Sequence, residues 1–458
     1  MLVLSSVMPQ IEGRLSLSHL KVAEEQNEAS TDKCAFHLAI NRFVLSTDSL
    51  IDGMPPSLAV LESGARGARK KLLEYLAPYI TDPDPIGPGT KTFIAEIPDN
   101  KTWKLERLRN RVERREHALR IVSESFLVTL ISQFDTFIGA LVRAVLIQRP
   151  EILNASDRVL TFAQLQNFAS MDDARIHLMD KEIDQLLRGS HPDQIVWFEK
   201  RMGKSKVPFT GRLGKWPAFI EATERRNVVI HADAQTSHQY LEVCKSVGAD
   251  LPADMTVGTR LNINLTYNKG AYEATVEVGL RLGIIVWLQF RPKDGLLVLA
   301  TLNAVILDYV NEGKFALARD ICDFGCSLVA EYGNEGARKM LTLNLAQCHK
   351  WLNDEARMKE VLDAEDWSAC DLACKLALAV LKDQSVLIEG AVRDLAKING
   401  IEPNHYRSWP IFRKLRQDKK FQELFLEIYG EPLADELAAI ASVSKPILDE
   451  VTGLVAQI

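Results

Sequence analysis

The sequence predicts a mainly α-helical protein, in which a helical bundle is followed by helical repeats. Two observations favour this fold class. Apolar residues recur at helical spacing through residues 121–147, and the pattern ends just before Pro150. From Gly295 onward, apolar segments come in pairs whose matching positions are roughly 30–40 residues apart, which is typical of stacked helical hairpins.

Composition places the chain among ordinary globular proteins. Its 458 residues are enough for two or three domains, each with its own core. An apolar content of 47% and a charged content of 25% are typical of soluble proteins. The net charge of −6 excludes a general nucleic-acid coat protein, although a local cleft in an enzyme can still hold RNA.

Several features predict a soluble, cytoplasmic protein. Seven cysteines are too few for a disulfide framework, which favours a reducing compartment. The first residues have no basic region and only a short apolar run, so we do not expect a secretory signal. Polar residues such as Asp135 and Asn303 interrupt the two most apolar stretches, 126–147 and 295–310, so we expect no membrane span.

The first 100 residues form a region of unclear fold. Pro55-Pro56, Gly64 and Gly67 are expected to interrupt it, and the segment TDPDPIGPGT at 81–90 predicts a loop or linker. A helix is expected before this loop, over residues 68–79. We therefore place a first domain boundary near residue 100.

Residues 101–292 are expected to form the helical bundle. The long helix begins with seven basic and three acidic residues between Lys104 and Arg120. A solvated helix face is the common explanation, and a positive lip beside an RNA cleft is the alternative. Two shorter helices are predicted over 176–187 and 194–202. A basic loop, RMGKSKVPFTGRLGK, then lacks the glycine and lysine spacing of a phosphate-binding P-loop. A short strand is expected near 258–267, and another helix over 271–290.

Residues 293–458 predict a second domain of helical repeats. Three helical hairpins are expected between residues 295 and 400, resembling tetratricopeptide repeats. Small residues recur inside them and would allow close helix packing. The segment 405–430 is expected to cap the stack with inward-facing apolar side chains, which are Trp409, Phe412, Leu415, Phe421 and Phe425.

The stretch WPAFIEATERRNVVIHADAQTSHQY at 216–240 concentrates polar chemistry. Pro217 suits the first turn of a helix, where its missing amide proton is not needed. On that helix, Glu224, Asn227 and His231 are spaced i, i+3 and i+7, so they share one face. Arg226 lies on the flank, and its long stem can reach the same face. We expect a carboxylate, an amide, a guanidinium and an imidazole to converge here.

The spacing between an arginine and a following histidine, compared at every histidine, shows how specific the motif is. An arginine precedes a histidine by about five residues at three of the nine histidines, so that spacing alone is weak. Arg226 is the only one of these arginines that is followed directly by a polar residue, Asn227. The stricter pattern therefore occurs once in the chain.

The segment RNVVIH at 226–231, on a helix that follows a long amphipathic helix, resembles the HEPN (higher eukaryotes and prokaryotes nucleotide-binding) domain over roughly residues 115–290. The resemblance implies an all-helical bundle that dimerises. Many members are metal-independent ribonucleases whose active site combines Arg and His from both protomers, and these catalytic roles map onto Arg226, Asn227 and His231. The layout with helical repeats also resembles bacterial toxins and antiviral-defence effectors of this family.

The residue chemistry agrees with this resemblance. Cleavage of RNA without a metal needs one group to take the 2′-hydroxyl proton and another to protonate the leaving oxygen, and histidine suits both tasks. An arginine can stabilise the charge that develops on phosphorus-bound oxygens. The neighbouring Arg225 and Glu224 are candidates for substrate binding, although pairing with a surface cation is the more common role for a residue such as Glu224. Asp233 and His238 are weaker candidates.

No metal or cofactor is expected. The pairs Cys322/Cys326 and Cys370/Cys374 would each lie on one helix face, but their spacing favours close packing over zinc binding. The sequence thus predicts a dimeric, metal-independent endoribonuclease that acts on RNA, with repeats that bind a protein partner or trigger. The alternative is a non-catalytic interaction protein whose HEPN-like bundle only dimerises or binds a nucleotide.

Overall fold

The computed structural model describes residues 34–82, 94–154, 160–202 and 209–433. A mainly α fold is confirmed. The described residues include one short antiparallel strand pair, β1 (Ile80–Asp82) with β2 (Ile94–Ala95). Most of the predicted linker at 81–90, the middle of the basic loop at 203–208 and the chain after residue 433 lie outside the described residues.

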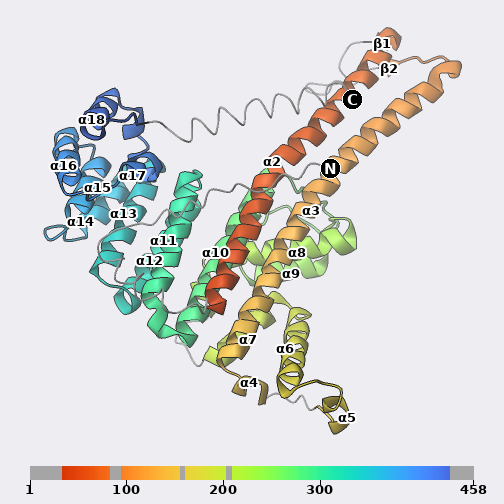
Figure 1. Cartoon of the computed structure of the whole chain (residues 1–458). Helices are drawn as coiled ribbons and strands as arrows, with labels where there is room; N and C mark the ends of the chain where they lie inside the picture. The colour runs from red at the N-terminus through yellow and green to blue at the C-terminus, as the bar shows by residue number, and fades with distance from the viewer. Residues whose placement is uncertain (1–33, 83–93, 155–159, 203–208, 434–458) are drawn as a thin grey trace, which may run out of the picture.

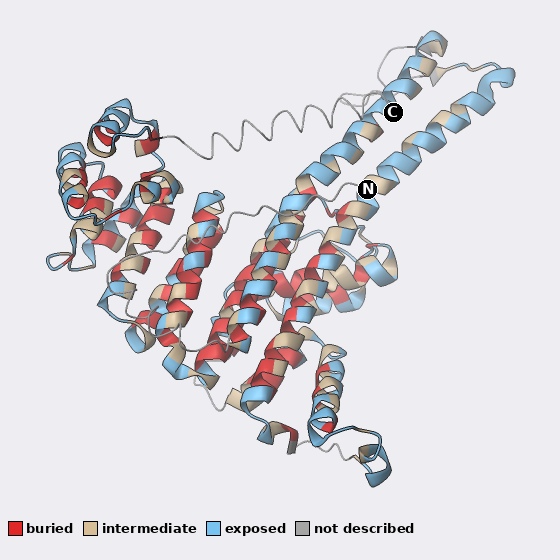
Figure 2. Cartoon of the chain, viewed as in Figure 1, coloured by how far each residue is buried: buried red, intermediate tan, exposed pale blue. Residues whose placement is uncertain are grey.

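Two long antiparallel helices, α2 (Ala35–Leu76) and α3 (Thr102–Gln148), form the longest feature of the molecule (Figure 1). They lie side by side, and the strand pair joins them at the far end. The second half of α2 and the first half of α3 project beyond the other helices. Figure 2 shows that this projecting part is mostly exposed, whereas the other halves of the two helices carry most of their buried residues.

The N-terminal region is not interrupted where the sequence predicts, and this expectation is wrong. Helix α2 continues through Pro55, Pro56, Gly64 and Gly67, so the predicted helix at 68–79 is only its last part. Proline and glycine disfavour a helix interior when propensity acts alone. Here α2 packs along α3, and this tertiary packing outweighs the local preferences.

Helix α10 (Leu265–Phe290) lies at the centre of the core and packs against α2, α3 and the candidate helix α8. Gly279 allows the close approach of α2, because a Cβ atom there would lie only 2.3 Å from Cε1 of Phe43. The Phe43 ring in turn stacks on Phe137 of α3, with 4.4 Å between ring centroids. These contacts fix the position of α10, and α10 supports the helices that carry the candidate site.

Six shorter helices follow α3, and they confirm the predicted helices at 176–187 and 194–202. They are α4 (Glu151–Asn154), α5 (Phe162–Leu165), α6 (Met171–Leu187), α7 (His191–Met202), α8 (Trp216–Ala232) and α9 (His238–Ser246). The strand expected near 258–267 is wrong. Leu261 and Ile263 are buried in alternation, but the segment forms one isolated bridge, between Gln235 and Arg260, and no strand in the described part of the chain pairs with it.

The C-terminal part consists of the expected helical hairpins. They are formed by α11 (Gly295–Asn311), α12 (Phe315–Tyr332), α13 (Glu335–Trp351), α14 (Glu355–Asp363), α15 (Leu372–Leu381) and α16 (Ser385–Lys397). The capping segment contains α17 (Pro403–Ser408), two 3-10 turns (Pro410–Phe412 and Leu415–Gln417) and α18 (Lys419–Tyr429). Phe412, Phe421 and Phe425 are buried as predicted, and Trp409 and Leu415 pack against them. The tetratricopeptide assignment itself stays a prediction.

One hydrophobic core extends from Phe36 in α2 to Cys348 in α13. This core contains residues from both sides of each predicted domain boundary, at residues 100 and 292. Polar contacts also join the two parts, because Lys215 before α8 and Arg281 of α10 both reach Asp320 of α12. Lys215 Nζ lies 3.1 Å from Asp320 Oδ2, and Arg281 Nη2 donates to the Asp320 carbonyl over 3.1 Å. A second cluster, between Leu376 and Leu433, forms the core of the cap.

Two helical segments, Asp99–Gln148 and Pro292–Asn311, are long and apolar enough to cross a membrane by length and composition. In each, 56% of the most apolar window is buried inside the protein. Core helices pass the same test, so the expectation of a soluble protein stays a prediction.

Candidate functional site

Helix α8 carries the candidate residues and is held on one side by the core. It starts at Trp216 with Pro217 in its first turn, as predicted. Phe219, Ile220 and Ala222 are fully buried against the bundle. The helix ends at Ala232, and the opposite face reaches solvent in the last turn, where Ile230 and His231 are exposed. The polar residues of α8 therefore lie between a buried start and an open end.

Arg226 is fixed by hydrogen bonds on two sides. Its Nη2 donates to Asp135 Oδ2 of α3 over 2.9 Å, and its Nη1 donates to Asn227 Oδ1 over 3.2 Å. The side chains of Arg226 and Asp135 are about one quarter exposed, at 22% and 26%. A partly buried ion pair of this kind holds the guanidinium in a defined orientation while leaving some of its N–H groups for a ligand.

His191, the first residue of α7, completes the surroundings of Asp135. Its Nε2 lies 3.0 Å from Asp135 Oδ1, so the carboxylate bridges the imidazole and the guanidinium of Arg226. The imidazole packs edge-on against Phe219 and tilted against Phe134, with centroid distances of 5.4 and 5.7 Å. These aromatic contacts restrict the orientation of the imidazole beside Asp135.

Glu224 belongs to the same group of residues. Asn227 Nδ2 donates to Glu224 Oε1 over 3.4 Å. Burial raises the pKa of the Glu224 carboxyl, and the nearby His191, Asn227 and Arg226 partly oppose that rise. We call the five residues the α8 cluster, namely Asp135, His191, Glu224, Arg226 and Asn227.

The raised pKa predicts how Glu224 affects stability. The folded chain binds this proton more tightly than the unfolded chain, so its stabilising contribution is complete below the ordinary pKa of a glutamate and is lost as the pH rises through the raised value. We expect the unfolding free energy of the wild type, relative to Glu224→Gln, to fall from acid to neutral pH. Denaturant unfolding of both proteins between about pH 4 and pH 8 measures this difference, and a constant difference would contradict it.

Arg225 has a structural role. Its Nε donates to Glu221 Oε1 over 2.7 Å, and its guanidinium lies 3.8 Å from the centroid of the Tyr267 ring. Glu221 also accepts hydrogen bonds from Tyr240 and from Tyr267. Both side chains of the Arg225–Glu221 pair are only 11% exposed. These contacts direct Arg225 into the protein, away from the α8 cluster, so we do not assign it to substrate binding.

His231 is exposed in the last turn of α8, apart from the α8 cluster. No hydrogen bond or ion pair joins it to another described residue. It follows Asn227 by four residues and so lies about one turn further along that face of α8, whereas Arg226 is held toward Asp135 of α3. One chain alone therefore brings together Glu224, Arg226 and Asn227, while His231 stands apart.

The turn after α8 fixes where His231 lies. Asp233 and Ala234 both have left-handed backbone conformations, with φ of 48° and 58°, which is uncommon for residues other than glycine. The Ala234 amide donates to the Val228 carbonyl over 3.0 Å and closes the helix. The Asp233 carboxylate forms two hydrogen bonds with Arg260, of 2.8 and 2.9 Å. Asp233 thus serves the turn, and the weaker candidate His238 is an exposed residue at the start of α9.

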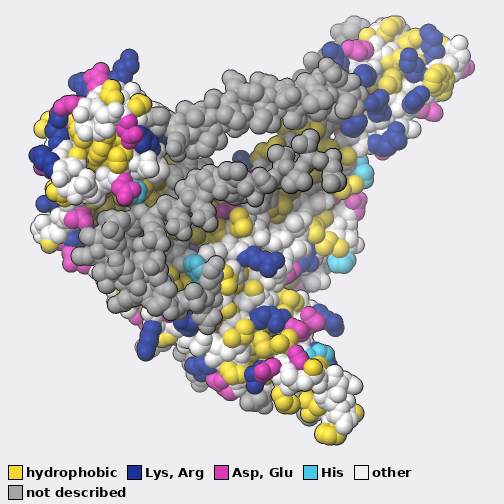
Figure 3. Space-filling model, in the orientation of Figure 1, with side chains coloured by type: hydrophobic (Ala, Val, Ile, Leu, Met, Phe, Trp, Pro, Cys, Tyr) yellow, Lys and Arg dark blue, Asp and Glu magenta, His cyan; other side chains and the backbone are white. Residues whose placement is uncertain are grey.

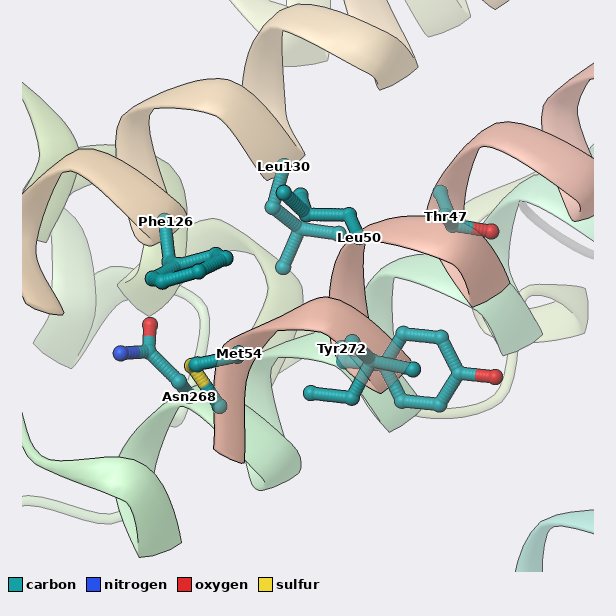
Figure 4. Close-up of a pocket in the computed structure, with 8 residues that line it drawn as sticks. Thr47, Leu50, Met54, Phe126, Leu130, Asn268 and Tyr272 are labelled. Atoms are coloured by element: carbon teal, nitrogen blue, oxygen red, sulfur yellow. The ribbon is translucent and has the colours of Figure 1, made fainter. Parts of the chain in front are cut away.

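A small pocket lies elsewhere, at the base of the projecting helices (Figure 4). Helices α2, α3 and α10 contribute its lining, which consists of Thr47, Leu50, Ile51, Met54, Phe126, Leu130, Asn268 and Tyr272. It holds no charged side chain and no residue of the α8 cluster. Its polar members are hydrogen-bonded elsewhere, so the pocket offers little for acid–base chemistry. Asn268 donates to the Ser123 carbonyl over 3.0 Å, Thr47 to the Phe43 carbonyl over 2.9 Å and the Tyr272 hydroxyl to Asp48.

The cysteines pack between helices. Cys322 is fully buried, and its thiol donates to the Leu341 carbonyl over 3.1 Å. All seven cysteines are free. Within the described ranges, no three His, Cys, Asp or Glu side chains are grouped so that they could hold a metal ion.

The sequence pattern identified three members of the α8 cluster and missed Asp135 and His191. The available signals were a carboxylate inside the apolar run of α3 and a His-Pro pair at a helix start. Neither signal shows that the two residues meet Arg226. Comparisons of the chain with protein-family models, with curated proteins and with solved structures found no match, so the HEPN relationship stays a prediction from the sequence.

Proposed function

We propose that the protein is a metal-independent endoribonuclease of the HEPN type, in which Arg226, Asn227 and His231 act on RNA. The observation that carries the proposal is the arrangement on α8. A guanidinium held by Asp135 and Asn227 precedes an exposed histidine near the end of the same helix. Fixed cationic donors are effective where charge develops in a transition state, and an exposed imidazole is accessible to a substrate.

The proposed reaction is an internal transesterification of RNA. The 2′-oxygen attacks the neighbouring phosphorus atom, and a histidine takes the 2′-hydroxyl proton. The bond between phosphorus and the 5′-oxygen breaks, and a second acid returns a proton to that oxygen. The products are a 2′,3′-cyclic phosphate and a 5′-hydroxyl, and Arg226 would stabilise the charge on the phosphoryl oxygens.

We propose that the complete site needs two copies of the chain. Arg226 is held toward Asp135 of α3, and among the described residues no hydrogen bond joins it to His231, so we assign the second half of the site to another copy. A second α8 opposite the first would supply the other histidine and arginine. Ile230, beside His231, is an apolar side chain that is 48% exposed, and it would gain by burial in such an interface.

Asp135 and His191 have a positioning role in this proposal. Asp135 would orient Arg226 through its hydrogen bond, and His191 would orient Asp135. We further propose a cytoplasmic toxin or defence effector, with α11–α18 as the surface that binds a protein partner or trigger. These assignments follow from the family resemblance.

One observation favours the alternative of a non-catalytic interaction protein. Asp135 neutralises Arg226 within a single chain, which weakens the attraction of Arg226 for phosphate. In that case the bundle would only dimerise or bind a nucleotide. The two functions differ in whether the purified protein breaks RNA.

The test is an RNA cleavage assay with an excess of metal chelator. We expect single-stranded RNA to be cut at the same rate with and without chelator, and the 3′ ends of the fragments to carry a 2′,3′-cyclic phosphate. RNA whose 2′-hydroxyls are methylated should stay intact, because it lacks the attacking oxygen. A requirement for Mg²⁺, or fragments with a 3′-hydroxyl, would exclude this mechanism. Intact RNA throughout would favour the non-catalytic alternative.

A further inference from the structure

The projecting ends of α2 and α3 form a slender arm, which we define as residues 60–79 and 94–120. Among the described residues, the two helices of the arm pack mainly on each other. Ala65 and Ala68 are buried at their contact, and Arg69 pairs with Glu116 across it. Gly64 makes room for Arg115, because a Cβ atom at Gly64 would lie 3.1 Å from Arg115 Nη1. The rest of the arm's surface is open to solvent.

The arm is strongly basic in a chain that is acidic overall. The arm contains twelve Lys and Arg against seven Asp and Glu, whereas the whole chain contains 55 against 61. All twelve of these basic side chains are exposed. Figure 3 shows Lys and Arg side chains gathered on the arm in this view. Such segregation produces a local positive field, which attracts a polyanion despite the negative net charge.

The spacing of the charges argues against an ordinary solvated helix. Ordinary exposed helices gain stability from opposite charges three or four residues apart, and like charges at this spacing destabilise them. Helix α3 carries the reverse pattern in a row that consists of Lys104, Arg107, Arg111 and Arg115. Arg107 and Arg111 have no carboxylate partner among the described residues. Successive members rise about 5–6 Å along the helix, so the row presents a line of positive charges.

Aromatic side chains lie among the charges near the tip of the arm. Trp103 is 60% exposed. The Tyr75 and Tyr79 rings lie 5.8 Å apart, Lys104 lies over the Tyr75 ring, and Lys101 Nζ is 2.8 Å from the Tyr79 hydroxyl. Proteins that bind single-stranded nucleic acid combine basic side chains for the phosphates with aromatic rings for the bases. Tyrosine, tryptophan and lysine also suit an anionic membrane interface, so the vesicle measurement below separates that partner from RNA.

The root of the arm adjoins the end of α8. Ser123 of α3, three residues beyond Arg120, donates to the Ile263 carbonyl over 2.6 Å, and Arg260 in the same segment pairs with Asp233 in the turn after α8 over 2.8 Å. Asp233 is only two residues beyond His231. A strand that follows the arm from its tip would therefore arrive at the exposed end of α8.

We propose that the arm binds single-stranded RNA without sequence preference and leads it toward the exposed end of α8. This inference deepens the proposed function and rests on it for the choice of RNA as the polyanion. Binding by the arm does not require cleavage, so the two proposals can fail separately.

The test measures binding of the full-length chain to a fluorescent, 2′-O-methylated, single-stranded RNA of about 20 nucleotides. This probe has no attacking hydroxyl, so it reports binding alone. The variant carries K104Q, R107Q and R111Q together. We expect Kd to rise about 10- to 100-fold at 0.1 M salt, and the slope of log K against log salt to become about 2 units shallower, because three phosphate contacts are lost.

The matched control removes three exposed lysines from the repeats and the cap, as K359Q, K419Q and K420Q. Its change in net charge is the same, and we expect its Kd to stay within about twofold of the wild type. Circular dichroism of both variants should show the helical content and melting of the wild type, because all six side chains are exposed.

Three results would overturn the proposal. The first is equal weakening by the arm variant and the control. The second is tight binding to vesicles of anionic lipid with none to the RNA probe. The third is an altered oligomeric state of the arm variant with unchanged RNA affinity, which would make the arm a protein interface. Arm-dependent binding without any cleavage of ordinary RNA would instead retain this proposal and remove the ribonuclease.

Discussion

Replacing His231 by alanine is expected to slow RNA cleavage by about 100- to 10,000-fold, the range lost when a general acid or base is removed. Replacing Arg226 by alanine is expected to cost about 100- to 1,000-fold, as for other donors that stabilise a developing oxyanion. Arg226→Lys should recover little of this loss, because an ammonium group does not reproduce the planar donors that contact Asp135 and Asn227. Initial rates with labelled RNA in chelator measure all three variants.

His238→Ala provides the matched control. His238 is also an exposed histidine and lies only seven residues after His231, at the start of α9. We expect its cleavage rate to equal that of the wild type. Wild-type rates in His231→Ala would remove His231 from the mechanism. Equal losses in His231→Ala and His238→Ala would point to a general structural effect.

Arg225→Ala is expected to destabilise the fold by about 3–5 kcal/mol, the range for breaking one side of a buried ion pair. Glu221 would keep its charge but lose its only cationic partner among the described residues. It would remain buried beside the hydroxyls of Tyr240 and Tyr267. Unfolding by urea, followed by circular dichroism, measures the loss.

A double variant and Arg226→Ala serve as comparisons for Arg225→Ala. In Glu221→Gln/Arg225→Met no charge is left unpaired, so we expect it to be clearly more stable than Arg225→Ala alone. Arg226→Ala should destabilise less than Arg225→Ala, because the Arg226 side chain is twice as exposed, at 22% against 11%. A fully stable Arg225→Ala protein with weakened RNA binding would instead place Arg225 in the substrate site.

The helices could be predicted where apolar periodicity and local stop signals agree. The hairpins from α11 to α16 end close to the expected residues, because each helix buries one apolar stripe against its neighbours. The extent of α2 could not be predicted, because local helix preferences place a helix end at Pro55 and Pro56. The packing of α2 against α3 outweighs these preferences. The expected strand near 258–267 failed for a related reason. Its alternation reflects burial of Leu261 and Ile263 in an extended segment that has no neighbouring strand.

In the candidate site too, the spacing along one helix predicts some of the residues, and tertiary packing places the others. Helical spacing alone placed Glu224 and Asn227 on one face, and their side chains are hydrogen-bonded. Asp135, which holds Arg226, comes from α3, and His191, which contacts Asp135, comes from α7, so their positions depend on how three helices pack. Arg225 could not be separated from Arg226 by sequence, because adjacent residues differ in function only through the side of the helix that the core covers.

Because one core extends from Phe36 to Cys348, the stability of α8 depends on helices of the repeat region. Lys215 forms an ion pair with the Asp320 carboxylate of α12, and Arg281 donates to the Asp320 backbone carbonyl. The start of α8 is therefore bonded to a helix that the sequence assigns to the repeats. Unfolding of that repeat would expose the apolar faces of α10 and release the residue that precedes Trp216. We therefore expect the helix that bears Arg226 and His231 to unfold together with α11–α13. Its stability against local unfolding then depends on residues beyond 300 as much as on its own sequence.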